Sequence, residues 1–150
     1  MSQLSYTAKS FNELTPHELY AILKLRCEIF VVEQNCLYVD PDGKDQECFH
    51  VLAYLDGKML AYTRLVPAGV SYDDSPSIGR VVIDAAFRDR KWGYELMEYS
   101  MKKCEELFGT KKITISAQYH LQHFYEKCGF KAIGEVYMED DIPHIKMKTY

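Results

Sequence analysis

The apolar residues of the chain repeat with a helical period in two long segments. Between residues 16 and 31 they recur every three or four positions, which predicts a helix with one buried stripe. Thr15 and Glu18 have the spacing of a capping box, so this helix should begin directly after Thr15. A second amphipathic helix is predicted over 91–108, and Gly109 is typical of a residue that ends a helix.

Shorter apolar runs predict the strands. Residues 49–55 and 58–66 flank Asp56-Gly57, a two-residue turn typical of an antiparallel hairpin. Residues 78–84 form another apolar strand, and the polar segment 34–47 is interpreted as a loop. The remaining predicted elements are a strand over 113–117, a short helix over 120–128, and strands over 130–138 and 142–149.

The order of these elements predicts the fold class. Residues 78–117 contain a strand, a helix and a strand, a unit whose two strands are expected to run parallel with a right-handed crossover. With a strand near the start of the chain, the full order is β-α-β-β-β-α-β-α-β-β. This order predicts an α/β (α+β) domain with a mixed sheet that has helices on its faces. No repeat or flexible linker divides the sequence, so we expect a single domain over residues 1–150.

Composition and charge argue against several classes of function. The 150 residues carry 18 basic and 22 acidic side chains, and the resulting net charge of -4 argues against a nucleic-acid partner. No apolar run approaches the ~18 residues of a spanning helix, and the first residues lack the layout of a signal peptide. The five cysteines form no C-x-x-C pair, which argues against a disulfide framework and a zinc site. We therefore expect a cytoplasmic protein with no membrane, nucleic-acid or metal partner.

Positive charge is concentrated at the start of the second helix. Arg88, Arg90 and Lys91 lie within four residues, shortly after the strand over 78–84, and Gly93 would let a ligand approach the backbone closely. Because a helix N-terminus presents free N–H groups, this segment predicts a site for a phosphate or pyrophosphate. The alternative is a solvated helix start with incidental charges. The patterns G-x-x-x-x-G-K-[ST] and G-x-G-x-x-G do not occur, which disfavours enzymes that use ATP or a dinucleotide.

Two segments resemble the signatures of the GNAT superfamily of N-acetyltransferases. Residues 78–97 (IGRVVIDAAFRDRKWGYELM) are similar to the acetyl-CoA segment, in which a strand leads through an Arg/Gln-x-x-Gly-x-Gly/Ala turn into a helix. Residues 116–130 (SAQYHLQHFYEKCGF) resemble the second signature. The sequence departs from the first pattern at Lys91, which replaces the first glycine, and at Asp89, which also replaces a common glycine. Shorter matches that resemble the ElaA-type branch of this superfamily occur at residues 25–34, 78–81, 117–122 and 141–144.

The resemblance implies a fold and an activity. The fold would be that of the GNAT-like acyl-CoA N-acyltransferases, with a central mixed sheet of six to seven strands flanked by helices. The activity would be direct transfer of an acetyl group from acetyl-CoA to a primary amine of a small molecule or peptide, within a ternary complex and without a metal. The alternative is a non-catalytic acyl-CoA-binding or regulatory module that keeps the cofactor cleft. We expect a monomer or a homodimer.

The resemblance also assigns expected roles to residues. Tyr125 matches the family's usual proton donor to the CoA thiolate. The residues expected to bind the cofactor are Val81, Val82, Ile83, Arg88, Asp89, Arg90, Lys91, Trp92, Gly93, Tyr94, Gln122 and Phe124. Those expected beside the acceptor are Arg26, Gln34, His50, Arg80 and His144.

The base that removes a proton from the acceptor amine is left open. An alkyl amine with a pKa near ~10.4 is mostly protonated at neutral pH, so it must lose a proton before it attacks. The candidates are Glu33, His50, His120 and His144, of which Glu33 and His120 are the two assigned to catalysis. A histidine titrates near neutral pH, whereas a glutamate would need to act through water or to have its pKa raised by burial.

Two further features bear on the acceptor. The loop over 34–47 contains Asp40, Asp42 and Asp45, and this acidic segment suggests that the acceptor amine is cationic. Arg26 falls on the apolar stripe of the first predicted helix. Its side chain either extends along the apolar surface to reach solvent or has a specific role inside the protein.

Overall fold

The computed structural model describes residues 4–149, and it contains the helices and strands predicted from the sequence, close to their predicted bounds. The strands are β1 (Ser5–Ser10), β2 (Phe49–Leu55), β3 (Lys58–Val66), β4 (Ser77–Ile83), β5 (Thr114–Gln118), β6 (Lys131–Glu139) and β7 (Ile142–Lys148). The α-helices are α1 (Pro16–Arg26), α2 (Trp92–Phe108) and α3 (Gln122–Lys127). Shorter helical segments are η1 (Phe11–Glu13), η2 (Cys27–Glu33), η3 (Asp45–Glu47), η4 (Ala85–Arg90) and η5 (Tyr119–Leu121).

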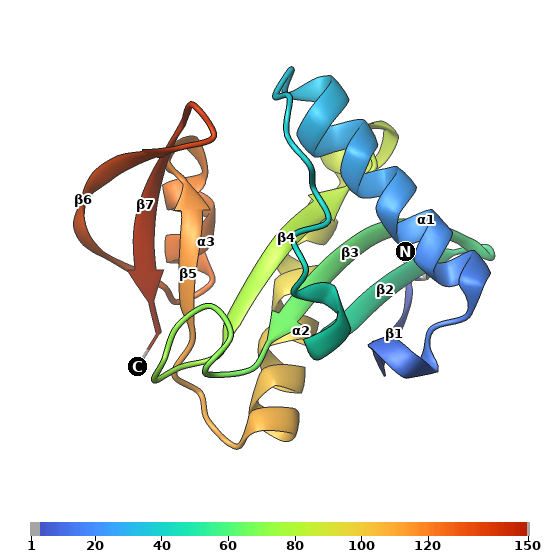
Figure 1. Cartoon of the computed structure of the whole chain (residues 1–150), viewed down its shortest axis with the longest axis horizontal. Helices are drawn as coiled ribbons and strands as arrows, with labels where there is room; N and C mark the ends of the chain where they lie inside the picture. The colour runs from blue at the N-terminus through green and yellow to red at the C-terminus, as the bar shows by residue number, and fades with distance from the viewer. Residues whose placement is uncertain (1–3, 150) are drawn as a thin grey trace.

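Within residues 4–149, the strands form two antiparallel sheets, with the orders β1-β2-β3-β4 and β5-β7-β6. β4 and β5 meet near their starts, where the Thr114 N–H donates to the Pro76 carbonyl at 3.0 Å, and then diverge (Figure 1). The seven strands agree with the expected strand count, but the continuous mixed sheet is divided because β4 and β5 form no ladder in the described chain. A bulge in β4, where Arg80 has a φ of 50°, bends the strand as it leaves β5.

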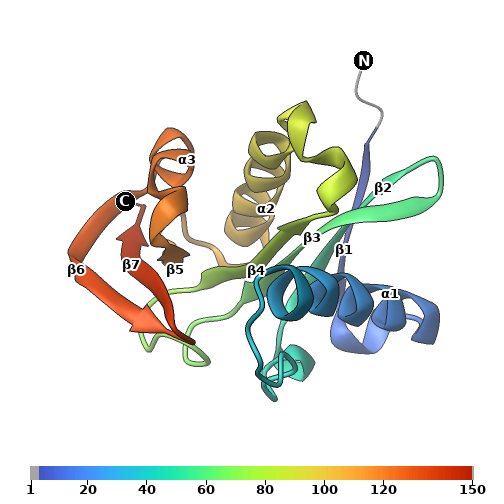
Figure 2. The same ribbon diagram turned by 90° about the horizontal axis from the view of Figure 1, so that it is seen from above.

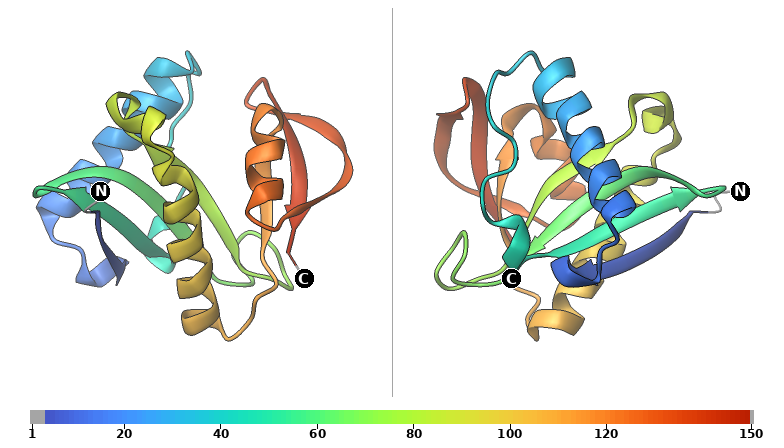
Figure 3. Two further views of the ribbon diagram at one scale, coloured as in Figure 1. Left: turned by 180° about the vertical axis from the view of Figure 1, so that it is seen from behind. Right: turned by 45° about the vertical axis from the view of Figure 1, so that its right-hand side comes forward.

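The helices cover the sheets in layers. α1 lies on one face of the four-stranded sheet and α2 lies on the other (Figure 2). Seen from behind, α2 and α3 stand on the same side of the two sheets (Figure 3). The larger buried core is on this side, where Leu96 and Met97 of α2 join Ile115 of β5 in one apolar cluster. Over residues 4–149, no helix is long and apolar enough to cross a membrane.

The first helix begins as predicted and ends differently. Thr15 Oγ1 accepts from the Glu18 N–H at 3.1 Å, and Glu18 Oε1 accepts from the Thr15 N–H at 2.8 Å, which completes the capping box. The α-helix predicted to reach residue 31 stops at Arg26, and Cys27–Glu33 continues as a π-helix. The wider π-helical turns bring the end of this segment to the gap between the two sheets, where Glu33 lines a pocket.

Candidate active site

A pocket of about 460 Å³ opens where β4 and β5 diverge. Its walls come from η2 and the residues after it, from β4, from the start of α2, from α3, and from the strands of the second sheet. The predicted site residues that line it are Glu33, Gln34, Arg80, Val81, Val82, Ile83, Arg88, Lys91, Gly93, Tyr94, His120, Phe124, Tyr125 and His144. The predicted site residues that do not line it are Arg26, His50, Asp89, Arg90, Trp92 and Gln122.

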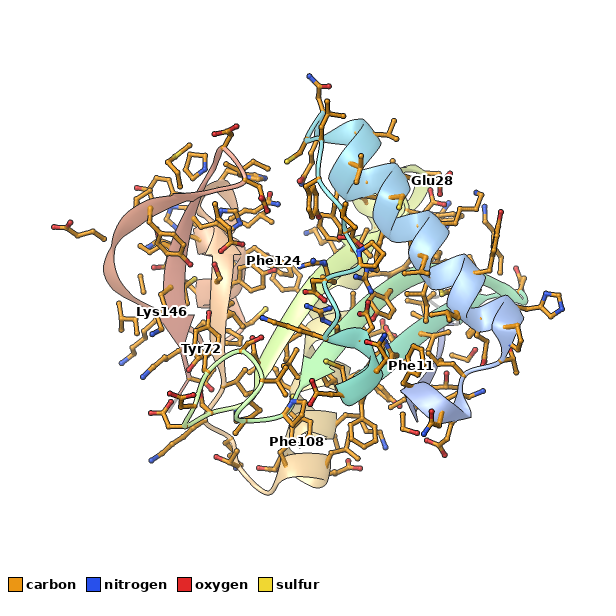
Figure 4. The ribbon with its side chains drawn as sticks, viewed as in Figure 1. Phe11, Glu28, Tyr72, Phe108, Phe124 and Lys146 are labelled. Atoms are coloured by element: carbon orange, nitrogen blue, oxygen red, sulfur yellow. The ribbon has the colours of Figure 1, made fainter. Side chains whose placement is uncertain are left out.

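The start of α2 has a backbone that lets α3 pack closely against it. Lys91 is the N-cap of this helix and has left-handed backbone angles (φ 60°, ψ 20°), which explains why a glycine suits this position. Glycine also suits position 93, because a Cβ at Gly93 would make a tight contact of 3.1 Å with Phe124 Cε1. The ring of Phe124, which projects between the sheets in Figure 4, packs on Tyr94 with a centroid distance of 4.9 Å. α2 and α3 therefore meet closely at the pocket wall.

The three cations before α2 have separate surroundings. Arg88 lines the pocket, where its Nη1 and Nη2 both bond the carboxylate of Glu33, with Nη2 2.9 Å from Oε1. The guanidinium of Arg90 lies over the rings of Phe87 and Trp92, 5.5 Å and 5.4 Å from their centroids. Arg90 and the buried Trp92 therefore support the turn from outside the pocket. Lys91 is the pocket-lining cation that has no ion pair within residues 4–149.

Two other predicted cofactor residues also lie outside the pocket wall. Asp89 is exposed in η4. Gln122, at the start of α3, donates to Glu126 Oε2 at 3.1 Å on the exposed surface of that helix.

Tyr125 presents a polar atom to a largely apolar part of the pocket. Its residue surface is 7% exposed, and this burial raises the pKa of the phenol above its usual value. Among residues 4–149, no side chain or backbone group forms a hydrogen bond with its hydroxyl, although the residue lines the pocket. At neutral pH the phenol is therefore protonated, and it is free to donate a hydrogen bond to a ligand.

A buried ionic network lies behind the pocket and corrects the interpretation of the acidic loop. Asp40, Asp42 and Asp45 face three arginines instead of an acceptor: Arg26 Nε bonds Asp40 Oδ2 at 2.6 Å and Arg80 Nε bonds Asp40 Oδ1 at 2.9 Å. The other pairs are Arg26 Nη1 with Asp45 Oδ1 at 2.8 Å, and Arg64 Nη1 with Asp42 Oδ1 at 2.8 Å and Asp45 Oδ1 at 2.9 Å. The prediction that these carboxylates attract a cationic amine is wrong, because their charges are already neutralised.

Arg26 and His50 belong to this interior. Arg26 has no exposed surface, so it neither reaches solvent nor contacts the pocket. His50 is equally buried, with Nδ1 2.6 Å from the Tyr62 hydroxyl and Nε2 2.9 Å from the Asp45 carbonyl. Burial lowers the pKa of this imidazole. Because both ring nitrogens are occupied, His50 is not available as a base or as a contact to substrate.

Contacts distant in sequence join the segment after the π-helix to the second sheet. Gln34 and Gln118 exchange two hydrogen bonds of 3.2 Å through their side-chain amides. The Cys36 thiol donates to the Asp140 carbonyl at 3.3 Å. Together with the pair between Glu33 and Arg88, these contacts hold both sides of the pocket in one arrangement. Gln118 lies in a segment that resembles the family, whereas Cys36 and Asp140 lie in a loop and a turn that carry no sequence signal for the site.

The second sheet presents a polar face to the pocket. Ser116 and Gln118 from β5 and His144 from β7 line it, as does Glu139 at the end of β6. His120 also lines the pocket, but it is an exposed residue whose ring forms no hydrogen bond within residues 4–149. In the same part of the chain, no group of three His, Cys, Asp or Glu residues is arranged to hold a metal ion.

Comparison with known proteins places this fold among the acyl-CoA N-acyltransferases. A family model described as an acetyltransferase (GNAT) domain matches residues 30–150. The chain therefore belongs to the GNAT acetyltransferase family, and it is an acyltransferase.

Its relatives are similar over nearly their whole length. Protein ElaA of Escherichia coli (strain K12) is 43% identical over 140 residues, which cover 91% of this chain and 90% of ElaA. The crystal structure of an acyl-CoA N-acyltransferase from Pseudomonas aeruginosa matches with a TM-score of 0.90 at 44% identity, covering 97% of this chain and 99% of that one. The crystal structure of E. coli ElaA also matches with a TM-score of 0.90, at 38% identity and with the same coverage. The expected fold class and the expected ElaA-like branch are thereby confirmed.

Proposed function

We propose that this protein transfers an acetyl group from acetyl-CoA to a primary amine of a small molecule or peptide, by direct transfer within a ternary complex. The observation that carries the proposal is Tyr125, a buried residue that lines the pocket between the start of α2 and the diverging strands and whose protonated hydroxyl has no hydrogen-bond partner within residues 4–149. A proton donor in this position suits a reaction that releases a thiolate.

The cofactor end of the pocket fits a phosphorylated ligand with an extended arm. The first N–H groups of α2, a helix of 17 residues, and the unpaired Lys91 would bind the pyrophosphate. Within residues 4–149, no strand pairs with the edge of β4 that faces away from β3 along Val81–Ile83, so its backbone can pair with the amide groups of the pantetheine arm. An N–H on the same edge would stabilise the charge that develops on the thioester oxygen.

The reaction needs two proton movements at the acyl group. The amine nitrogen forms a bond to the carbonyl carbon, the carbon–sulfur bond breaks, and the sulfur takes a proton from the Tyr125 hydroxyl. The nitrogen gives up a proton as the amide forms, and this proton restores the Tyr125 phenol. Burial raises the pKa of the phenol, and a thiolate released beside it would be more basic for the same reason. Burial therefore raises both the pKa of the proton donor, Tyr125, and that of the CoA thiol formed when the thiolate accepts the proton.

Carboxylates on another wall of the pocket favour a cationic acceptor. Glu139 and Asp140, at the hairpin between β6 and β7, line the pocket, whereas Asp40, Asp42 and Asp45 of the 34–47 loop are paired internally. An alkylammonium group would be attracted to this wall. The cationic acceptor first suggested by the 34–47 loop is thus supported by a different segment of the chain.

A thiol-release assay tests the proposal. Acetyl-CoA is supplied with spermidine, a lysine-containing peptide, benzylamine, glycine and glutamate, and free CoA thiol is measured. We expect amine-dependent release that is fastest with the cationic acceptors. Binding of acetyl-CoA without release by any amine would support the non-catalytic acyl-CoA-binding module instead.

Tyr125→Phe is the matched variant, because it removes only the hydroxyl. We expect kcat to fall by about 10²-fold, in line with the loss of a general acid, while the Kd for acetyl-CoA stays unchanged. Unchanged turnover in this variant would reject Tyr125 as the proton donor.

A further inference from the structure

His144 differs from the other pocket histidine in having a fixed ring orientation. It lies on β7 with its side chain 9% exposed, and its Nδ1 is 2.7 Å from the Ile142 carbonyl oxygen. A carbonyl oxygen only accepts hydrogen bonds, so Nδ1 must carry the proton of the neutral ring. The lone pair of the neutral imidazole is therefore at Nε2.

A carboxylate stands beside this lone pair. Nε2 of His144 is 3.6 Å from Glu139 Oε2, and the ring is stacked on Tyr137 with a centroid distance of 6.1 Å. Ser116 Oγ bonds both the Tyr137 hydroxyl and, at 3.3 Å, Glu139 Oε1, which orients the carboxylate. Glu139 is therefore the ion-pair partner of this nitrogen once Nε2 takes up a proton.

The other groups that face His144 bring no unbalanced positive charge. Its neighbour on β5 is Gln118, which is neutral, and its neighbour on β6 is Tyr137. Tyr38 and Arg80 also line the pocket, and the charge of Arg80 is matched by Asp40 at 2.9 Å. Neither strand neighbour of His144 carries a positive charge, and the pocket-lining cation without an ion pair in residues 4–149 is Lys91, at the start of α2.

The remaining candidates for the base are less suited to the task. Both carboxylate oxygens of Glu33 are bonded to Arg88. Both ring nitrogens of His50 are bonded in the interior. His120 is exposed, and no hydrogen bond within residues 4–149 fixes which of its nitrogens is protonated.

We propose that Nε2 of His144 is the base that takes a proton from the acceptor ammonium group, with Ile142 and Glu139 positioning the ring. The inference rests on the proposed acetyl transfer. The nitrogen of the acceptor loses two protons in the reaction. One passes to His144 and then to solvent beside the half-exposed Glu139, and the other balances the proton that Tyr125 gives to sulfur. The products are the amide, the free thiol of CoA and one released proton.

His144→Asn is the informative variant. The amide nitrogen of asparagine can still donate to the Ile142 carbonyl, but the side chain has no basic nitrogen. His123→Asn is the matched control, because His123 is a 95% exposed histidine on α3 that bonds only Glu126. Thiol release from acetyl-CoA is measured between pH 6 and pH 10 with spermidine, or with the fastest primary alkylamine of the panel if spermidine is not turned over. The affinity for acetyl-CoA is measured in parallel.

The base role has a characteristic pH profile. In the wild type, kcat/KM should level off at a pH well below the pKa of the amine, because the enzyme supplies the base. In His144→Asn it should be lower by about 10²-fold at pH 7 and should rise about tenfold per pH unit toward the pKa of the amine, near ~10.4. The deficit should therefore almost disappear by pH 9.5, with unchanged affinity for acetyl-CoA and a normal profile for His123→Asn.

Three results would overturn the inference while leaving acetyl transfer intact. These are wild-type activity in His144→Asn, a deficit that is the same at every pH, and a pH-dependent deficit that appears in His120→Asn instead. The absence of amine-dependent thiol release from the wild type is a separate outcome, which would remove the proposed function and this inference with it.

Discussion

Replacing Arg26 with methionine removes a cation from the centre of the buried ionic network. The Arg26 guanidinium makes three hydrogen bonds, to Asp40 Oδ2 at 2.6 Å, to Asp45 Oδ1 at 2.8 Å and to the Asp40 carbonyl at 3.2 Å. Methionine fills much of the space of the aliphatic stem, so the main loss is electrostatic. The variant leaves three aspartates facing two arginines.

The magnitude follows from the partners that remain. Removing one member of a buried ion pair typically costs ~3–5 kcal/mol. Asp40 keeps Arg80 at 2.9 Å and the Tyr38 hydroxyl at 2.8 Å, and Asp45 keeps Arg64 at 2.9 Å. We therefore expect the free energy of unfolding to fall by about 3 kcal/mol, the lower end of that range. A domain of this size is commonly stable by ~5–15 kcal/mol, so the variant should still fold.

Urea unfolding measures this loss. The fluorescence of Trp92, the single tryptophan and a buried residue, reports the tertiary structure, and far-ultraviolet circular dichroism reports the helices. With a slope of ~1–3 kcal/mol per molar urea, the midpoint should fall by about 1–3 M. The double variant Arg26→Met with Asp40→Asn restores the balance of charge and should recover part of the stability. A loss below about 1 kcal/mol, or no recovery in the double variant, would refute the network as a source of stability.

Further predictions concern the pocket rim and the response to acid. Lys91→Gly should raise the free energy of unfolding by up to about 1 kcal/mol, because glycine adopts the left-handed backbone conformation without strain; urea unfolding measures this gain. The same variant should weaken acetyl-CoA binding because a cation is lost, and calorimetric titration measures this loss. Glu33→Gln should strengthen acetyl-CoA binding, because loss of the ion pair with Arg88 frees the guanidinium for phosphate. The gain should be at most about fivefold, since a pair that is 41% exposed is worth ~0.2–1 kcal/mol. Weaker binding would show that the pair is also present when acetyl-CoA is bound. Burial opposes the ionisation of Asp42 and Asp45, but hydrogen bonds from arginine dominate and hold the pKa of both carboxyls below the usual value. The unfolded chain therefore binds more protons in acid, and the stability that these groups add above about pH 4 should be lost as the pH falls through their folded pKa values, with a weaker pH dependence in Asp45→Asn.

The elements that the sequence predicted well are those whose signals are local. The hairpin of β2 and β3 follows from two apolar runs and the turn at Asp56-Gly57, and α1 begins at the capping box of Thr15 and Glu18. The π-helix at Cys27–Glu33 was missed because π-helical segments are rare and short, so the helical period of α1 was extended through it.

The pocket could be predicted in part. The family resemblance identified the segments that reach it, including Tyr125, Gly93 and the edge of β4, because each lies on an element with a recognisable pattern. It also predicted that Arg90 and Trp92 contact the cofactor, although their side chains pack on each other outside the pocket wall. Neighbours in one turn of chain point in different directions, and only the packing of the turn decides which of them face the ligand.

By itself, the sequence determined the helices, the strands and their order, because periodicity, capping and turn chemistry act between residues that are close along the chain. The family followed from the resemblance of two segments to known signatures. The tertiary structure alone decided the partners of the charged and titratable groups. Asp40 pairs with Arg80, 40 residues away, and Glu33 pairs with Arg88, 55 residues away. The same carboxylate attracts a substrate when it faces an open pocket and stabilises the fold when it faces a buried guanidinium, and that difference depends on which distant segments the fold brings together.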